Sequence, residues 1–199
     1  MAKRQKFIIG IDEVGRGPVA GPVAVCALCL QNNFNIKKFK NFKDSKKLSH
    51  LQRLKWLVKI DEEKKKGNIV YGVSFQSNKV IDKKGIVFAI KKALANSLKC
   101  LRKKPADCLV LLDGGLRAPE KYKSQKTIIK GDEKELAIAL TSIVAKETRD
   151  GLMVRLARKY PSYGLDKHKG YGTREHYKAL KKHGLSPLHR RSFLTKIKA

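Results

Sequence analysis

Acidic residues are scarce in this chain. Its 199 residues include 17 Asp and Glu against 46 Lys and Arg, a formal net charge of +29 at pH 7. Such an excess of cations predicts a surface that binds a polyanion, and nucleic acid is the obvious one. A lysine bias shared by a whole proteome gives the same composition, so charge alone does not decide the question. In so basic a chain, however, acids that are grouped at strand ends indicate a site.

Long apolar runs and a complete set of metal-binding cysteines are also missing. No stretch of about 18 apolar residues is present, which argues against a membrane-spanning helix. The N-terminus leads into a strand without the apolar segment of a signal peptide.

Cys26 and Cys29 have C-x-x-C spacing, but they lie in an apolar run, and no second Cys or His pair completes a zinc set. We expect these two cysteines, with Cys100 and Cys108, to be core or near-surface thiols in a cytoplasmic protein.

Residues 7–18 are the most informative stretch. An apolar run, Phe7 to Ile11, predicts a buried strand, and Asp12 and Glu13 follow it directly. The next residues, Gly15 to Pro18, combine two glycines, an arginine and a proline, and glycine lets a backbone approach a ligand closely. Because adjacent strand residues face opposite sides, both acids share one site only if the strand ends at or directly after Asp12. A solvated turn is the alternative interpretation of this acid pair.

The same pattern of strand, acid and glycine occurs a second time. Cys108 to Leu112 is fully apolar and predicts a central strand, and Asp113 and two glycines follow it. Two such strand ends lying side by side would bring Asp12 and Asp113 together. A turn-forming aspartate is the alternative for Asp113. Further on, Asp132 with Glu135 has helix N-cap spacing, so capping is the alternative interpretation of Asp132.

The remaining patterns predict an α/β protein. Residues 19–30, 69–75 and 124–130 read as strands, the first in a hairpin with residues 7–11 and the last at a sheet edge. Helices are predicted from about residue 50, over 85–101, from 131 to about 158, and over 173–183. In the first of these, Ser49 and Gln52 form a capping box, and the predicted inner face carries four apolar residues: Leu51, Leu54, Leu57 and Val58.

The C-terminal part of the chain differs in character. Residues 160–173 are basic, aromatic and rich in glycine, and residues 189–193 add a histidine and two arginines. Basic side chains interleaved with tyrosine and glycine suit contacts to phosphate and ribose. A solvated surface segment is the commoner alternative.

Seven short motifs, in order along residues 7–193, together resemble ribonuclease HII, the type 2 ribonuclease H family. They are Asp-Glu-Val-Gly-Arg-Gly-Pro (12–18), Asp-Ser-Lys-Lys-Leu (44–48), Asp-Gly (113–114), Lys-Gly-Asp (130–132), Ser-Ile-Val-Ala-Lys-Glu-Thr-Arg-Asp (142–150), His-Lys-Gly-Tyr-Gly-Thr (168–173) and His-Arg-Arg-Ser-Phe (189–193). The resemblance implies an RNase H-like fold, a central mixed five-stranded sheet flanked by helices. Residues 1–158 would form this catalytic domain, and residues 159–199 a basic helical extension packed on it.

The resemblance also implies an activity. The family hydrolyses RNA in RNA/DNA hybrids and cuts 5′ to a single ribonucleotide in duplex DNA, leaving 3′-hydroxyl and 5′-phosphate ends. Two divalent ions, Mn²⁺ or Mg²⁺, are expected with substrate, and the cellular role is removal of misincorporated ribonucleotides and RNA primers. We expect a monomer whose partners are these nucleic acids, with a DNA clamp left open as a further partner and no membrane involved.

Site residues carry over by position. Four acids match the catalytic and metal-binding carboxylates of the family: Asp12, Glu13, Asp113 and Asp132. The junction ribose is recognised by positions that match Gly15, Arg16, Gly17 and Tyr171, and Lys46 matches a lysine near the scissile phosphate. Asp150, His168, Lys169 and Arg190 are secondary candidates. Four facing carboxylates would repel one another, and Mg²⁺ binds a few carboxylates together with water and phosphate oxygens.

Two functions of other kinds remain as alternatives. One is a basic nucleic-acid-binding protein without activity, although such a protein gains nothing from carboxylates that face phosphate. The other is an RNase H-like nuclease that acts on DNA alone, such as a resolvase, which has no 2′-hydroxyl to recognise through Gly15 to Gly17 and Tyr171. The related ribonuclease HIII is a poorer match, because it lacks the arginine between the two glycines.

Overall fold

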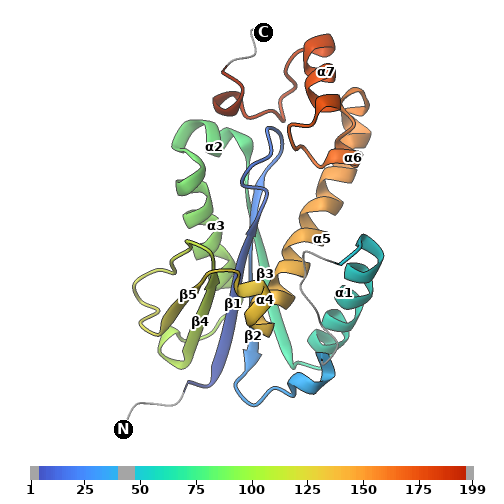
Figure 1. The fold of residues 1–199 in the computed structure, drawn as a ribbon. Helices are drawn as coiled ribbons and strands as arrows, with labels where there is room; N and C mark the ends of the chain where they lie inside the picture. The colour runs from blue at the N-terminus through green and yellow to red at the C-terminus, as the bar shows by residue number, and fades with distance from the viewer. Residues whose placement is uncertain (1–4, 40–47, 196–199) are drawn as a thin grey trace.

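A mixed sheet of five strands forms the centre of the molecule (Figure 1). The computed structural model describes residues 5–39 and 48–195. Its strands, which lie in the order β3-β2-β1-β4-β5, are β1 (Phe7–Val14), β2 (Val23–Gln31), β3 (Ile69–Gln76), β4 (Cys108–Asp113) and β5 (Gln125–Ile128). β1, β2 and β3 pair antiparallel, whereas β4 and β5 join the other side of β1 in parallel. The predicted sheet, with its opening hairpin and its last strand at an edge, is confirmed.

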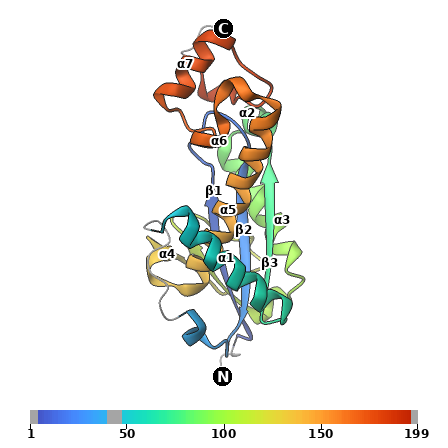
Figure 2. The ribbon, with the colours of Figure 1, turned by 90° about the vertical axis from the view of Figure 1, so that its right-hand side faces the viewer.

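Helices cover both faces of the sheet. The longer ones are α1 (His50–Lys65), α3 (Ile86–Cys100), α5 (Leu136–Lys159) and α7 (Arg174–His183), and the shorter ones are α2 (Asn78–Lys84), α4 (Gly131–Lys134) and α6 (Leu165–His168). Figures 1 and 2 show α3 against one face and α5 with α1 against the other. None of the helices in the described part of the chain has the length and apolar character needed to cross a membrane.

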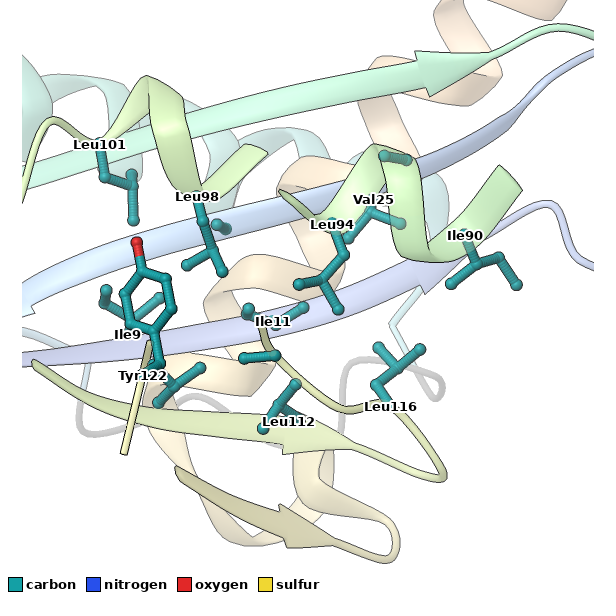
Figure 3. Packing of buried hydrophobic residues seen from close by; sticks show 14 of the residues in the cluster. Ile9, Ile11, Val25, Ile90, Leu94, Leu98, Leu101, Leu112, Leu116 and Tyr122 are labelled. Atoms are coloured by element: carbon teal, nitrogen blue, oxygen red, sulfur yellow. The ribbon is translucent and has the colours of Figure 1, made fainter. Parts of the chain in front are cut away.

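Each face has its own apolar core. Under α3, the predicted stripe over 85–101 is confirmed, because Ile90, Leu94 and Leu98 point toward Ile11 and Leu112 of the sheet (Figure 3). On the other face, α5 and α1 pack over the opposite side of β2 and β3. All four cysteines are free thiols, as expected, and Cys26, Cys29 and Cys108 are buried.

Gly10 sets how closely α5 approaches β1. A Cβ atom at this position would lie 2.2 Å from the carbonyl oxygen of Ala137, so no side chain larger than hydrogen fits. The first turns of α5 therefore lie directly against the middle of β1. This contact brings the polar residues of the next turns, Ser142 and Lys146, to the carboxyl end of the strand.

The predicted inner face of α1 is only partly right, since Leu57 packs on the core but Leu51, Leu54 and Val58 are exposed. Leu51 and Val58 are 71% and 59% exposed, and Ile60 is the apolar residue that the helix buries fully. Arg53 turns toward α5, where its Nε donates to Glu147 at 2.6 Å. The inward side of α1 therefore carries Arg53, Leu57 and Ile60, with Arg53 paired to a buried carboxylate.

The single helix predicted from residue 131 is interrupted. Glu135 has extended backbone angles (φ −125°, ψ 116°) and separates α4 from α5. The residue at the N-cap of α4 is Lys130, in the left-handed region at φ 54°. Asp132 therefore lies inside the first turn and does not cap the helix, so the capping interpretation is wrong. Its side chain is buried at the edge of the sheet instead.

The C-terminal segment packs on the second half of α5 and on the chain between β1 and β2. Apolar contacts join Val19 and Ala20 to Met153, Leu165 and Leu180. The backbone amides of Val19 and Ala20 both donate to the carbonyl of Gly170. The predicted helix over 173–183 is α7, and Thr173 caps it by accepting a hydrogen bond from the amide of His176.

Candidate active site

Asp12 and Asp113 lie side by side at the carboxyl ends of parallel strands. The register pairs Ile11 of β1 with Leu112 of β4, and each acid is the next residue of its strand. The backbone amide of Gly131 donates to Oδ1 of Asp113 at 2.7 Å, which holds the start of α4 against this strand end. The predicted meeting of the two strand ends is confirmed, and α4 brings a third acid, Asp132, next to them.

The strand does not end at Asp12, contrary to expectation. β1 continues to Val14 and stays paired with β2, in which Val25 lies opposite Glu13. Pairing with β4 stops at Ile11, so the last residues of β1 have a neighbouring strand on one side only. Asp12 and Glu13 consequently line the same pocket without a break in the strand.

The pocket at this corner has a volume of about 350 Å³. Its wall carries three acids, two cations, a hydroxyl and an aromatic ring: Asp12, Glu13, Asp113, Arg53, Lys146, Ser142 and Tyr171. Arg53, Ser142 and Lys146 were not among the predicted site residues. Ser142 and Lys146 have i, i+4 spacing within the motif at 142–150, a signal that could have found them. Nothing in the spacing around Arg53 distinguishes it, because the packing of α1 on α5 alone brings it there.

Buried negative charge dominates the electrostatics of this pocket. Burial, together with the neighbouring charges of Asp113, Glu13 and Asp132, raises the pKa of Asp12 to about 8, against a hydrogen bond from Ser142 that lowers it. Burial also raises the pKa of Glu13, while Arg16, at 3.6 Å, lowers it. A hard cation would relieve the repulsion among these groups.

Residues 15–17 form a loop beside these acids. Gly15 has φ +86° and is buried, and a Cβ atom there would lie 2.1 Å from Nε of Arg149, so packing and backbone conformation both require glycine. Arg16 and Gly17 are exposed, and a Cβ atom at Gly17 would meet nothing within 4 Å. The outer part of the loop is therefore open to a ligand.

Tyr171 links the acidic pocket to a second, larger one. The tyrosine is 39% exposed and lines both, as do Arg53 and Lys146. The second pocket, of about 640 Å³, runs between α1, α5 and α6 and adds four basic residues and two acids: His50, Lys167, His168, Lys169, Glu147 and Asp150. Asp150 is paired with Lys146 at 2.8 Å. The two pockets give a continuous polar surface on which cations surround a patch of carboxylates.

A family model described as ribonuclease HII matches residues 9–196. This chain belongs to the ribonuclease HII family. It is 42% identical over 191 residues to ribonuclease HII of Clostridioides difficile (strain 630), and the match covers 96% of this chain and 71% of that protein. The ribonuclease HII of Prochlorococcus marinus (strain MIT 9312) is 46% identical over 188 residues, 94% of this chain and 88% of that one. Ribonucleases H are endonucleases, so the chain is a hydrolase of nucleic acid.

Solved structures agree with the fold. Ribonuclease H2 of Pyrococcus horikoshii OT3 is similar with a TM-score of 0.75 at 24% identity, and the match covers 96% of both chains. The ribonuclease HII of Archaeoglobus fulgidus, solved in complex with PCNA, has a TM-score of 0.73 at 25% identity, with 92% of this chain and 93% of that chain covered. The RNase H-like fold of this ribonuclease HII is thus shown by sequence and by structure.

The donor set of the pocket suits a divalent ion, but its ligands are not gathered into a closed cluster. In residues 5–39 and 48–195 no three His, Cys, Asp or Glu side chains are arranged as a metal site. Carboxylate oxygens are nevertheless the ligands that Mg²⁺ takes together with water and substrate phosphate, and Asp12, Glu13 and Asp113 line one pocket. These residues fit an ion whose coordination the substrate completes.

Two candidates are not among the residues that line the pocket in the described part of the chain. Lys46 is outside the described residues, so the structure does not place it. Arg190 is fully buried, and its guanidinium contacts backbone carbonyls behind the 15–17 loop rather than the pocket. Arg149 is buried beside it and was not singled out from the sequence, although it precedes Asp150 in a quoted motif.

Proposed function

We propose that this ribonuclease HII hydrolyses the RNA strand of RNA/DNA hybrids and cuts 5′ to a single ribonucleotide in duplex DNA, leaving 3′-hydroxyl and 5′-phosphate ends. The carrying observation is one pocket in which the half-buried Asp12 and Asp113 lie beside an exposed Tyr171. The carboxylates supply the means of hydrolysis and the tyrosine a means of detecting ribose. In the cell the reaction would remove misincorporated ribonucleotides and RNA primers from cytoplasmic DNA.

Asp12, Glu13, Asp113 and Asp132 would hold two divalent ions, Mg²⁺ or Mn²⁺, once substrate is bound. Such ions, when bound, supply a water of lowered pKa and neutralise charge on the leaving 3′-oxygen. The protein's part is to keep the four acids together despite their repulsion. The register of β1 with β4 and the Gly131 hydrogen bond to Asp113 support this role. Lys146, on the pocket wall, would contact a substrate phosphate.

Ribose recognition would come from residues 15–17 and Tyr171. The 2′-hydroxyl distinguishes RNA from DNA at a chosen nucleotide, and it both donates and accepts hydrogen bonds. The open backbone at Gly17 and the exposed side chain of Arg16 leave room for a sugar and its phosphate. Tyr171 would stack on or hydrogen-bond to the same nucleotide from the wall of the acidic pocket.

The duplex would extend over the second pocket. Lys167, His168 and Lys169 present basic groups there, and Lys46 is a further candidate for the scissile phosphate. We assign catalysis to residues 1–158 and duplex binding to the basic extension, 159–199, in a monomer. A sliding clamp is a further proposed partner, since the similar Archaeoglobus fulgidus protein was solved in complex with PCNA.

The test is cleavage of a labelled DNA duplex that contains one ribonucleotide, beside an all-DNA duplex of the same sequence. Each is incubated with Mg²⁺, Mn²⁺ or EDTA. We expect a metal-dependent cut 5′ to the ribonucleotide alone. Binding without cleavage in either metal would favour a binding protein, and cleavage of the all-DNA duplex would favour a DNA nuclease; either result overturns the proposal.

A further inference from the structure

Arg190 holds the 15–17 loop from behind. Its guanidinium is fully buried and donates to three backbone carbonyls, with Nη2 on Gly15 at 2.7 Å, Nη1 on Arg16 at 2.9 Å and Nε on Gly21 at 3.0 Å. Among the described residues no carboxylate lies within ion-pair distance of this guanidinium. A buried charge is expensive unless it is hydrogen-bonded. Here the N–H donors of the planar guanidinium bond to the carbonyls of Gly15, Arg16 and Gly21. These bonds fix the conformation of the loop.

The preceding residue, His189, reaches Tyr171 through a second histidine. Nε2 of His189 lies 3.0 Å from Nε2 of His176, and Nδ1 of His176 lies 2.8 Å from the carbonyl oxygen of Tyr171. A carbonyl can only accept, so Nδ1 of His176 carries a proton and its Nε2 accepts from His189. Nδ1 of His189 in turn accepts from the amide of Ser186 at 2.9 Å. One arrangement of protons, with both rings neutral, satisfies the whole chain.

Backbone contacts bind this segment to the chain between β1 and β2. His189 forms a β-bridge with Ala20, and the amide of Arg190 donates to the carbonyl of Val19 at 2.8 Å. Gly21 donates to the carbonyl of Leu188 at 2.9 Å. Adjacent residues of an extended segment face opposite sides, so His189 is directed to the Tyr171 side and Arg190 to the loop.

We propose that Arg190 and the His189–His176 pair are positioning residues that set the spacing between the 15–17 loop and Tyr171. The inference rests on the proposed function, in which those two elements contact the same ribonucleotide. Neither Arg190 nor His176 touches substrate. Two protein groups that bind the same sugar must be positioned to within about 0.5 Å. The consecutive residues His189 and Arg190 position both, because Arg190 bonds to the 15–17 loop and His189 reaches Tyr171 through His176. Cleavage is thereby restricted to a ribonucleotide that lies in one position relative to the catalytic acids.

The first test compares Arg190→Lys with Arg191→Lys. Both changes keep the charge, but only the first removes the buried guanidinium, because Arg191 is exposed. We measure kcat and KM on a duplex with one ribonucleotide and on a continuous RNA/DNA hybrid. Arg190→Lys should lower kcat on the single ribonucleotide by about 10- to 100-fold with KM nearly unchanged. The hybrid, which offers a 2′-hydroxyl at every nucleotide, should lose less than about threefold. Arg191→Lys, a change in the basic extension, should leave the ratio of the rates on the two substrates as in the wild type.

A second pair of variants separates the two bonds of His176. In His176→Asn the amide nitrogen lies near the place of Nδ1 and keeps the donor to Tyr171, whereas in His176→Gln it reaches toward His189 instead. The Gln variant should therefore lose more activity on the single ribonucleotide than the Asn variant. Equal losses on both substrates, in proportion to any fall in melting temperature, would show that these residues act through stability alone and would overturn the proposal.

Amide hydrogen exchange keeps this inference separate from the proposed function. If the wild type does not cut at a ribonucleotide, the proposed function is wrong. The hydrogen-exchange measurement then still tests whether Arg190 positions the loop. Faster exchange at residues 15–17 and 171 in Arg190→Lys, but not in Arg191→Lys, supports that role. Unchanged exchange at those amides in both variants would overturn it.

Discussion

Oδ1 of Asp113 accepts a hydrogen bond from the backbone amide of Gly131 at 2.7 Å. This bond joins the end of β4 to the first residue of α4, one position before Asp132. The end of β4 and the start of α4, 18 residues apart in the chain, are thus held together, and Asp132 is buried beside the pocket that Asp113 lines. The proposed catalytic residue Asp113 therefore also has a structural role, and the two roles can be separated by mutation.

Asp113→Asn and Asp113→Ala should differ in stability but not in activity. The asparagine keeps a carbonyl oxygen for the Gly131 amide, whereas alanine leaves that amide without its partner, which costs about 1–3 kcal/mol. Both variants should lose cleavage, because neither keeps the carboxylate. Urea unfolding and the duplex assay measure the two effects. Cleavage retained by Asp113→Asn would show that this carboxylate is not part of the metal site.

Asp12→Asn should abolish cleavage and raise the melting temperature of the metal-free protein. Removing one of several buried like charges relieves their repulsion, while loss of a metal ligand removes several kcal/mol of transition-state stabilisation, about a thousandfold in rate or more. Thermal melts with and without Mg²⁺ provide the control. The wild type should gain more stability from Mg²⁺ than the variant does, and an equal gain would place the ion elsewhere.

The two glycines of the 15–17 loop should respond differently to alanine. Gly15→Ala forces a positive φ on a residue with a side chain and drives its Cβ into Arg149, so we expect a loss of at least about 1 kcal/mol of stability. Gly17→Ala meets open space and should leave the free energy of unfolding nearly unchanged, while lowering cleavage at a single ribonucleotide. Wild-type cleavage by Gly17→Ala would exclude close backbone approach of the substrate there.

Tyr171→Ala should reduce cutting selectively at an isolated ribonucleotide. The exposed ring lies in the pocket with the acids, with its centre 6.0 Å from Cζ of buried Arg149, so its removal changes the pocket wall rather than the core. Stacking on a base or sugar is worth about 1–3 kcal/mol, which corresponds to a loss of about five- to a hundredfold. The ratio of rates on the single-ribonucleotide duplex and the continuous hybrid is the measurement, and an unchanged ratio would argue against a role at the junction.

Acid should weaken the histidine pair. Burial lowers the pKa of His176 from 6.5 to about 4 and also lowers the pKa of His189. The unfolded chain therefore binds more protons than the folded protein between pH 4 and 6.5, and the stability that His176 contributes is full above pH 6.5 and lost as the pH falls through this window.

The measurement is urea unfolding of the wild type and His176→Gln at several pH values. Asp12, whose pKa is raised to about 8, contributes the opposite slope in both proteins, so their difference isolates the histidine. The wild type should lose more stability than the variant between pH 6.5 and 4. Parallel curves would mean that His176 is not held neutral by the fold.

Local patterns in the sequence were enough for most of the secondary structure. Apolar runs predicted the strands, and the apolar stripe over 85–101 predicted α3, because burial on one or both faces imposes those periods. In α1 the apolar pattern predicted the inward position of Leu57 alone. Its apolar residues were assigned to the inner face, yet Leu51 is exposed and Arg53 turns inward to a carboxylate 94 residues away. A one-dimensional pattern does not record an ion pair with a partner on another helix.

The sequence by itself determined the family, the mixed sheet and the identity of the candidate acids, because these depend on residue types in a fixed order along the chain. Tertiary structure alone decided which of them meet. Pairing of β1 with β4 stops at Ile11, which puts Asp12 and Glu13 into one pocket without breaking the strand. It also decided that Arg190 faces the back of the 15–17 loop rather than the nucleic acid. Contacts between segments more than a hundred residues apart depend on packing and strand register, and no local spacing encodes them.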